Sequence, residues 1–150
     1  MSKIFTSLNF IHCMERFATQ IYRTQRGTFK GTPFAQQLMD ASETERTHVQ
    51  KFQNQIKKLN GRVYPLGWLF QFMGVVVGFI TRLCGKRILF KADTFVEMQA
   101  VKDYNSFLRA VNYDKDTVDL IRVIISDEEI HIANWKKASE SLAKRKSPII

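Results

Sequence analysis

Two four-residue stretches of this sequence combine a carboxylate and an imidazole at the same spacing. They are Glu45-Arg-Thr-His48 and Glu128-Glu-Ile-His131. On an α-helix, residues three apart lie on one face, so each stretch presents both groups in the same direction. Glu-x-x-His on two helices, joined by one inward glutamate from each of two others, is a ligand set that holds a pair of metal ions inside a helical bundle. Each stretch therefore predicts half of a metal site.

Single glutamates stand where this ligand set requires them. Glu15 precedes Glu45 by 30 positions, and Glu97 precedes Glu128 by 31. The two single glutamates are 82 positions apart and the two motif glutamates 83, which is the offset expected of two related helix pairs. Solvated helix-face charges with unrelated histidines are the alternative, and they do not account for this register. The predicted metal ligands are Glu15, Glu45, His48, Glu97, Glu128 and His131.

Three further side chains are candidates to assist the site. Tyr22 follows Glu15 by seven positions and Tyr104 follows Glu97 by seven, so two helical turns place each tyrosine on the face of its glutamate. The tyrosines could orient ligands or contact a substrate, or they could be hydrogen-bonded for structure alone. His12, three before Glu15, could support a ligand through a hydrogen bond, with a core histidine as the equal alternative.

Other residues near the two motifs are expected to lie outside the site. Glu43, Asp127 and Glu129 should face elsewhere, because close neighbours on a helix do not share a face. Phe52 and Trp135 each follow a motif glutamate by seven positions and are predicted to be core aromatics.

Length and composition predict one globular domain covering residues 1–150. The hydrophobic content is 45% and the charged content 25%, which is ordinary for a folded protein. Cys13 and Cys84 form no C-x-x-C pair, so neither a disulfide framework nor a zinc or rubredoxin-like site is supported, and both are expected to be free thiols. The first nine residues contain one lysine and no long apolar run, which is not typical of a signal or transit peptide.

Apolar periodicity and helix-breaking residues predict only helices. Thr32 should cap the second helix with Pro33 at its first position, Asn60-Gly61 should end it, and Asp114 should cap the last helix. The last helix should turn Val118, Ile121, Ile124 and Ile125 inward and end before Pro148. The ligand-bearing helices are predicted at about 5–26, 33–60, 87–111 and from 115 onward.

Residues 66–80 contain no charged side chain in fifteen positions. This stretch is shorter than the roughly 20 apolar residues of a membrane-spanning helix. One interpretation is a buried core helix, in which Gly74-x-x-x-Gly78 allows close packing. The other, which we favour, is a helix in the membrane interface with Trp68 at headgroup depth, because it accounts for the apolar residues together with the flanking cations. Those cations are Arg62, Arg82, Lys86 and Arg87.

The surface charge favours an anionic partner. The net charge is +9, and if the four glutamates are internal, 10 of the 14 acidic residues remain against 23 basic ones. Such a surface suits lipid headgroups or nucleic acid. The sequence contains no basic motif interleaved with aromatics of the kind that reads nucleic acid, so no nucleic acid is expected and an anionic membrane surface is the predicted partner.

The motifs together resemble the demethoxyubiquinone hydroxylases of the ferritin-like superfamily. The resemblance runs through His12-Cys-Met-Glu15 with Tyr22, both Glu-x-x-His stretches, the apolar stretch closing on Gly85-Lys86, and Val96-Glu97 with Tyr104-Asn105. It implies an all-α, ferritin-like four-helix bundle, with an additional short apolar membrane-interface helix between two helix pairs. It also implies that the six predicted ligands hold two iron ions, with manganese as the alternative.

The resemblance further implies an activity and a location. The activity is a monooxygenase in ubiquinone biosynthesis, which hydroxylates a polyprenyl quinol with dioxygen and takes electrons from NADH or from the quinol. The location is peripheral, on the cytoplasmic face of the inner membrane, or on the matrix side of the mitochondrial inner membrane in a eukaryote, beside other ubiquinone-biosynthesis proteins. Two other functions stay open: a soluble ferritin-like or rubrerythrin-like protein that oxidises iron or reduces peroxide, and an RNA-modifying di-iron hydroxylase.

Overall fold

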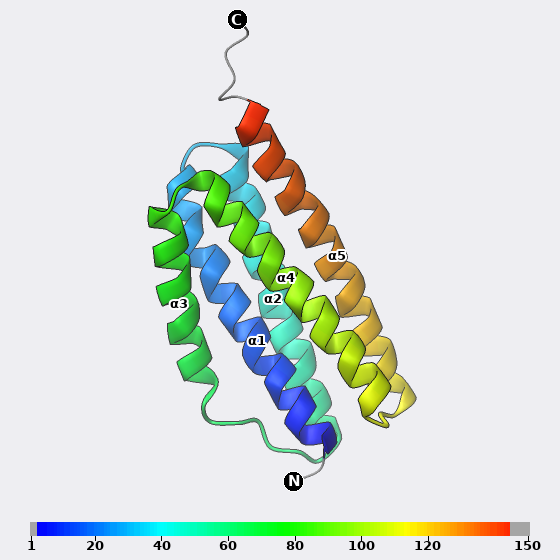
Figure 1. The fold of residues 1–150 in the computed structure, drawn as a ribbon. Helices are drawn as coiled ribbons and strands as arrows, with labels where there is room; N and C mark the ends of the chain where they lie inside the picture. The colour runs from blue at the N-terminus through cyan, green and yellow to red at the C-terminus, as the bar shows by residue number, and fades with distance from the viewer. Residues whose placement is uncertain (1–2, 145–150) are drawn as a thin grey trace, which may run out of the picture.

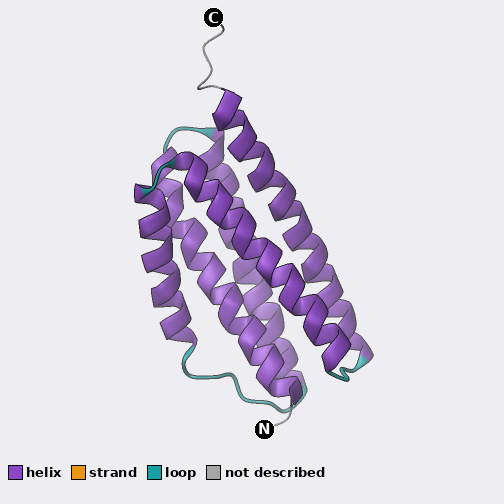
Figure 2. Cartoon of the chain, viewed as in Figure 1, coloured by secondary structure: helices purple, strands orange, loops and turns teal. Residues whose placement is uncertain are grey.

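The computed structural model describes residues 3–144, and this part of the chain is built from helices alone (Figure 2). The elements in order are α1 (Lys3–Gln25), the short 3-10 helix η1 (Arg26–Phe29), α2 (Pro33–Lys58), α3 (Gly67–Leu83), α4 (Lys86–Ala110) and α5 (Lys115–Lys144). The all-α prediction is confirmed for the described residues, with boundaries within a few positions of those expected. The predicted end of the last helix before Pro148 lies outside them.

The long helices α1, α2, α4 and α5 run side by side, and the shorter α3 lies along the edge of the bundle next to α1 (Figure 1). α1 packs closely on α2, and α4 packs closely on α5, so the chain forms two helix pairs. The connection between the pairs passes through α3, which packs mainly on α1. Each pair therefore carries one single glutamate and one Glu-x-x-His stretch.

Helix ends follow the predicted signals with one exception. Asp114 Oδ1 accepts a hydrogen bond of 2.8 Å from the backbone N–H of Thr117, as expected of a capping residue. Asn60, just after α2, has a φ of 59°, in the left-handed region that asparagine tolerates at helix ends. Thr32 stands at the N-cap of α2 with Pro33 following, but its hydroxyl donates to the carbonyl of Phe29 at 2.7 Å and does not cap the helix. The predicted role of that hydroxyl is wrong because the preceding turn competes for it.

The buried apolar side chains form two separate clusters. The first contains Ala18, Ile21, Tyr22, Phe29, Leu38, Ala41, Leu89, Phe90, Trp135 and Ala138. The second contains Leu8, Ile11, Phe52, Ile56, Tyr104, Tyr113, Ile121, Ile124 and Ile125. On α1, Glu15 lies between Ile11 of the second cluster and Ala18 of the first. A layer of buried polar side chains thus separates the two clusters, and Phe52 and Trp135 are core aromatics as predicted.

α3 presents one face to α1 and the opposite face to solvent. A Cβ added at Gly74 would lie 2.3 Å from the carbonyl oxygen of Phe17, and one at Gly78 would lie 2.9 Å from that of Ile21, so the absence of side chains lets the two helices approach. The other face is apolar and exposed, through Trp68, Leu69, Phe72, Met73, Val75, Val76, Phe79, Ile80 and Leu83. Within residues 3–144, no helix combines the length and hydropathy needed to cross a membrane.

Candidate metal centre

The six predicted ligands come together at the middle of the bundle, in two groups of four. One group contains Glu15, Glu45, His48 and Glu128, the other contains Glu45, Glu97, Glu128 and His131, and within each group the candidate ligand atoms lie within 4.8 Å of one another. All six residues are buried. Glu45 and Glu128 belong to both groups, so the two motif glutamates are the residues that could bridge two ions. Sequence spacing alone does not decide this.

The first group is centred on His48, which is fully buried. Its Nδ1 lies 3.4 Å from Glu15 Oε2, 3.4 Å from Glu45 Oε2 and 3.1 Å from Glu128 Oε1. Three carboxylates from three helices therefore surround one imidazole nitrogen.

The second group repeats this arrangement around His131, whose side chain is 10% exposed. Its Nδ1 lies 3.0 Å from Glu45 Oε1, 3.4 Å from Glu97 Oε1 and 3.1 Å from Glu128 Oε2. Each motif glutamate thus directs one oxygen to each histidine, which is the disposition of a carboxylate that bridges two positions.

The two tyrosines hydrogen-bond across the bundle. Tyr22 of α1 donates to Glu97 Oε1 of α4, and Tyr104 of α4 donates to Glu15 Oε1 of α1. The sequence placed each tyrosine on the face of the glutamate in its own helix, but each hydroxyl reaches the glutamate of the other helix pair. The hydrogen bonds orient the two single glutamates and tie the pairs together.

Asp127 corrects a sequence-based expectation. It was expected to face away from the site, but its Oδ2 lies 3.1 Å from His48 Nε2. A carboxylate that accepts this N–H fixes the imidazole orientation and leaves Nδ1 as the ligand atom. The helical argument failed because Asp127 need not share the face of Glu128 to reach a histidine on another helix. Glu43 and Glu129 are exposed as expected, and Glu43 pairs with Arg46 at 2.8 Å.

His12 lies outside both groups. Its side chain is fully buried, and neither ring nitrogen has a hydrogen-bond partner within the described residues. Burial, with a smaller contribution from the Arg16 charge, lowers the pKa of His12 to about 4. It is therefore neutral at physiological pH, and the predicted hydrogen bond to a candidate ligand is not formed.

Burial of four carboxylates gives the metal-free site an unusual affinity for protons. Burial and then the negative charges of Glu128, Glu97 and Glu15 raise the pKa of Glu45 well above its usual range. Burial and the charge of Glu128 raise the pKa of Glu97 to about 8. Burial alone would lower the pKa of His131, but the adjacent carboxylates of Glu128, Glu45 and Glu97 raise it to about 12. At neutral pH, bound protons therefore neutralise part of the negative charge of the metal-free site.

The donor atoms fit a pair of hard divalent cations. Both oxygens of Glu45, Nδ1 of His48 and Oε1 of Glu128 are buried, and none has a hydrogen bond of acceptable geometry, although carboxylates and imidazoles face each other at 3.0–3.4 Å. Buried polar atoms without partners are costly, and a cation between them removes that cost. Four carboxylates with one imidazole per position suit iron or manganese better than zinc or copper.

Comparison with known proteins identifies the family. The family model described as ubiquinone biosynthesis protein COQ7 matches residues 7–149. The chain belongs to the COQ7 family. The match spans all six candidate ligands, both tyrosines and Asp127, and it confirms the resemblance found in the sequence. Membership in the COQ7 family connects the chain with ubiquinone biosynthesis. No curated protein matches the chain.

Proposed function

We propose that this protein is a di-iron monooxygenase that hydroxylates a demethoxyubiquinol-type polyprenyl quinol in ubiquinone biosynthesis. The observation that carries the proposal is the pair of buried four-residue groups sharing Glu45 and Glu128, in a chain of the COQ7 family. Glu15 and His48 would complete one iron position, and Glu97 and His131 the other. When bound, two reduced irons supply the electrons and open positions that activate dioxygen.

The protein's own residues would hold this centre in place. The hydroxyl of Tyr104 engages Oε1 of Glu15 and leaves Oε2, which faces His48, free to bind a metal. The hydroxyl of Tyr22 engages Oε1 of Glu97, the oxygen that faces His131, and so orients that carboxylate. Asp127 holds the His48 ring with Nδ1 directed at the carboxylates. The two apolar clusters exclude water on either side, so the carboxylates would be neutralised mainly by the metals. The single domain predicted from the sequence is proposed to serve this one site.

Helix α3 is proposed to dock the protein on the membrane that contains the substrate. Trp68 and Phe72 are each 61% exposed, and Leu83 is 71% exposed, on a helix with cations near both ends. An apolar face at headgroup depth and cations on anionic lipid are typical of interfacial helices. This supports a peripheral membrane location. We propose the cytoplasmic face of the inner membrane, or the matrix side in mitochondria, where other ubiquinone-biosynthesis proteins would be partners.

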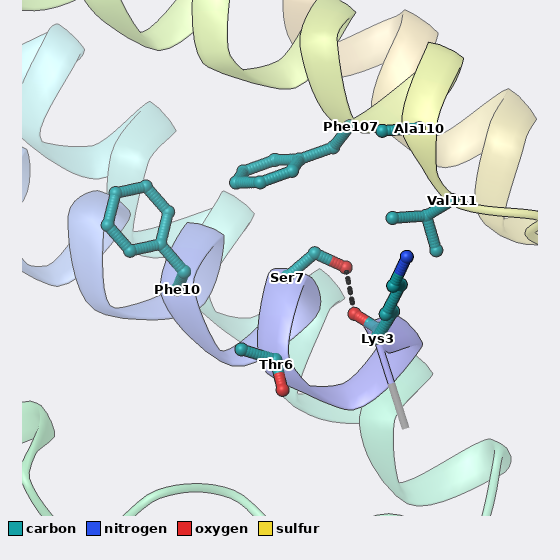
Figure 3. Close-up of a pocket in the computed structure, with 7 residues that line it drawn as sticks. All are labelled: Lys3, Thr6, Ser7, Phe10, Phe107, Ala110 and Val111. Atoms are coloured by element: carbon teal, nitrogen blue, oxygen red, sulfur yellow. Dashed lines mark hydrogen bonds between the residues drawn. The ribbon is translucent and has the colours of Figure 1, made fainter. Parts of the chain in front are cut away.

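A groove between α1 and α4 offers a place for part of the apolar tail of the substrate (Figure 3). Its volume is about 450 Å³, and Phe10 and Phe107 meet across it edge to face at 5.8 Å. Phe107 lies one helical turn after Tyr104, whose hydroxyl contacts Glu15. One end of the groove is therefore one helical turn along α4 from a side chain that contacts a candidate ligand. It is lined by Lys3, Thr6, Ser7, Phe10, Phe107, Ala110 and Val111.

The activity is tested by quinone profiling of a strain that lacks the gene. Accumulation of a demethoxy precursor, reversed by the wild-type gene and not by a Glu45→Ala variant, is the expected result. NADH and a reduced quinol, supplied separately to the iron-loaded protein, would identify the electron donor. An unchanged quinone pool would overturn the proposal and favour the soluble iron-oxidising or peroxide-reducing alternative, while loss of an RNA modification would favour the RNA hydroxylase.

Membrane docking is tested by replacing Trp68 and Phe72 with serine. We expect the double variant to leave liposomes and to lose turnover of long-tailed quinols while keeping that of a short-tailed analogue. Because both side chains are exposed, the melting temperature should change little; a buried pair would cost several kcal/mol. The matched control replaces Phe95 of α4 and Ile130 of α5, which are 67% and 57% exposed, with serine. Equal liposome binding by both double variants would contradict docking through α3.

A further inference from the structure

A second hollow, between the end of α1, η1 and α2, has a different chemistry from the groove. Its volume is about 370 Å³, and it is lined by Thr19, Arg23, Arg26, Met39, Ser42, Glu43 and Arg46. We call it the arginine pocket. Three guanidinium groups and one carboxylate converge here, so the pocket carries a net positive charge of two.

The carboxylate of the arginine pocket is already engaged. Glu43 Oε2 accepts from Arg46 Nε at 2.8 Å, so this pair is internally neutral. Arg26 Nη1 contacts the sulfur of Met39 at 3.7 Å, which is a weak acceptor. No described carboxylate lies within ion-pair distance of Arg23 or Arg26. Two guanidinium groups therefore share one hollow without an anion to balance them.

The floor of the arginine pocket connects to the metal site through hydrogen bonds. The Ser42 hydroxyl donates to the backbone carbonyl of Thr19 at 3.0 Å, and the Thr19 hydroxyl donates to the backbone carbonyl of Glu15 at 2.7 Å. Both side chains are buried, and Ser42 lies three residues before Glu45 on α2. Two candidate metal ligands are thus about one helical turn, roughly 4.5–6 Å along the axis, from the pocket floor.

We propose that the arginine pocket binds a phosphate-bearing anion. A guanidinium group offers paired N–H donors whose geometry matches two oxygens of a phosphate, and two such groups without acidic partners provide both charge and shape. The phosphate could belong to a soluble compound or to a lipid headgroup, since both present the same oxygens. The binding goes beyond the proposed hydroxylation and does not depend on it.

Pyrophosphate titration of the iron-loaded full chain tests the soluble source. At about ten times its dissociation constant, pyrophosphate should raise the melting temperature by roughly 3–5 °C, and calorimetry should record one site per chain. Arg23→Gln combined with Arg26→Gln should weaken pyrophosphate binding at least tenfold. The matched control is Arg109→Gln with Arg122→Gln, which removes the same charge from exposed positions elsewhere and should bind normally.

Vesicles test the lipid source. Flotation with phosphatidylglycerol vesicles, against phosphatidylcholine vesicles, compares the same two double variants. The phosphate would be assigned to a lipid headgroup by two results together. The Arg23, Arg26 variant alone would lose binding to anionic vesicles, and the wild-type protein would not bind pyrophosphate. Equal weakening in both double variants, or no dependence on Arg23 and Arg26 in either assay, would overturn the proposal. Quinol hydroxylation is read separately, so its failure leaves these outcomes intact.

Discussion

The two halves of the candidate metal centre are built from equivalent residues but differ in their surroundings. On the first side, His48 is fully buried and its Nε2 meets Asp127 at 3.1 Å. On the second side, His131 is 10% exposed at its side chain, and no described carboxylate pairs with its Nε2. One histidine is held from both ends of its ring, and the other from one end only.

This difference separates the part of the centre that is fixed from the part that is accessible. A histidine whose second ring nitrogen pairs with a carboxylate has one tautomer and one orientation. The Glu15–His48 position should therefore bind its metal more tightly than the Glu97–His131 position. The Glu97–His131 position is closer to solvent and has fewer constraints. We expect metal exchange to begin there.

The largest effect should come from the glutamates that belong to both groups. Glu45→Ala removes a candidate ligand from both positions and should abolish binding of both ions, whereas Glu15→Ala removes one from the first position only and should leave about one ion per chain. Elemental analysis of the purified variants measures this. Equal metal content in the two variants would mean that Glu45 does not bridge.

Asp127→Asn tests the asymmetry directly. Asparagine has nearly the same shape but is a weaker acceptor for His48 Nε2–H, so affinity at the first position should fall by about 10–100-fold. Competition with a calibrated chelator measures the affinity. Glu129→Gln, an exposed neighbour, is the control and should have no effect. A loss at the second position instead would contradict the assignment of Asp127 to His48.

The pH dependence of stability should change sign with metal. In the metal-free folded state Glu97 has a pKa of about 8, so above pH 5 it keeps a proton that the unfolded chain has lost. Above pH 6.5 the same is true of His131, whose pKa is about 12. The folded state then binds more protons, so its stability falls as pH rises. The depressed pKa of Glu128, about 2, acts only below pH 5.

Calorimetry with and without Mn²⁺ checks this prediction. The melting temperature of the chelated protein should drop by roughly 10–20 °C between pH 5 and 8. That of the loaded protein should rise over the same range, because the metals displace protons and bind more tightly when fewer compete. Parallel curves would indicate that protons and metals do not share these ligands.

The smallest effects are expected from replacing the two tyrosines. The two replacements again compare the two halves of the candidate metal centre. Tyr22→Phe leaves Glu97 without its donor, and Tyr104→Phe does the same to Glu15. Each should cost about 1–3 kcal/mol of unfolding free energy. Denaturant titration of loaded protein measures both. If each tyrosine instead served the glutamate of its own helix, Tyr104→Phe would weaken the Glu97 position, and metal analysis would detect it.

The six candidate ligands were predictable because helical geometry is local. Spacings of three and seven positions determine which side chains share a face, whatever the helices pack against. Contacts between helices were not predictable in the same way. The contact of Asp127 with His48 was not predicted, because the residue 83 positions before Asp127 is Thr44. The internal repeat therefore contains no second carboxylate at this position. The crossed tyrosine contacts and the shared glutamates likewise depend on how far apart the helix pairs lie.

The exposed face of α3 marks another limit of sequence-based prediction. The fifteen uncharged residues suggested either a core helix or an interfacial one, and the structure has features of both. Its glycines are buried against α1, as in a core helix, and its aromatics face outward. The sequence contained both signals, but only the position of α1 beneath the glycines assigns them to opposite faces.

The separation of the core into two clusters has a consequence for metal choice. The helices are held together above and below the ligand layer by side chains such as Trp135 and Phe52, which are buried and bind no metal. Protein interiors are close-packed, so the volumes of these side chains fix the distance between helices at the level of the carboxylates. We therefore expect the size of cation that fits to depend partly on aromatic residues one or two turns away, so that packing would contribute to any preference between iron and manganese.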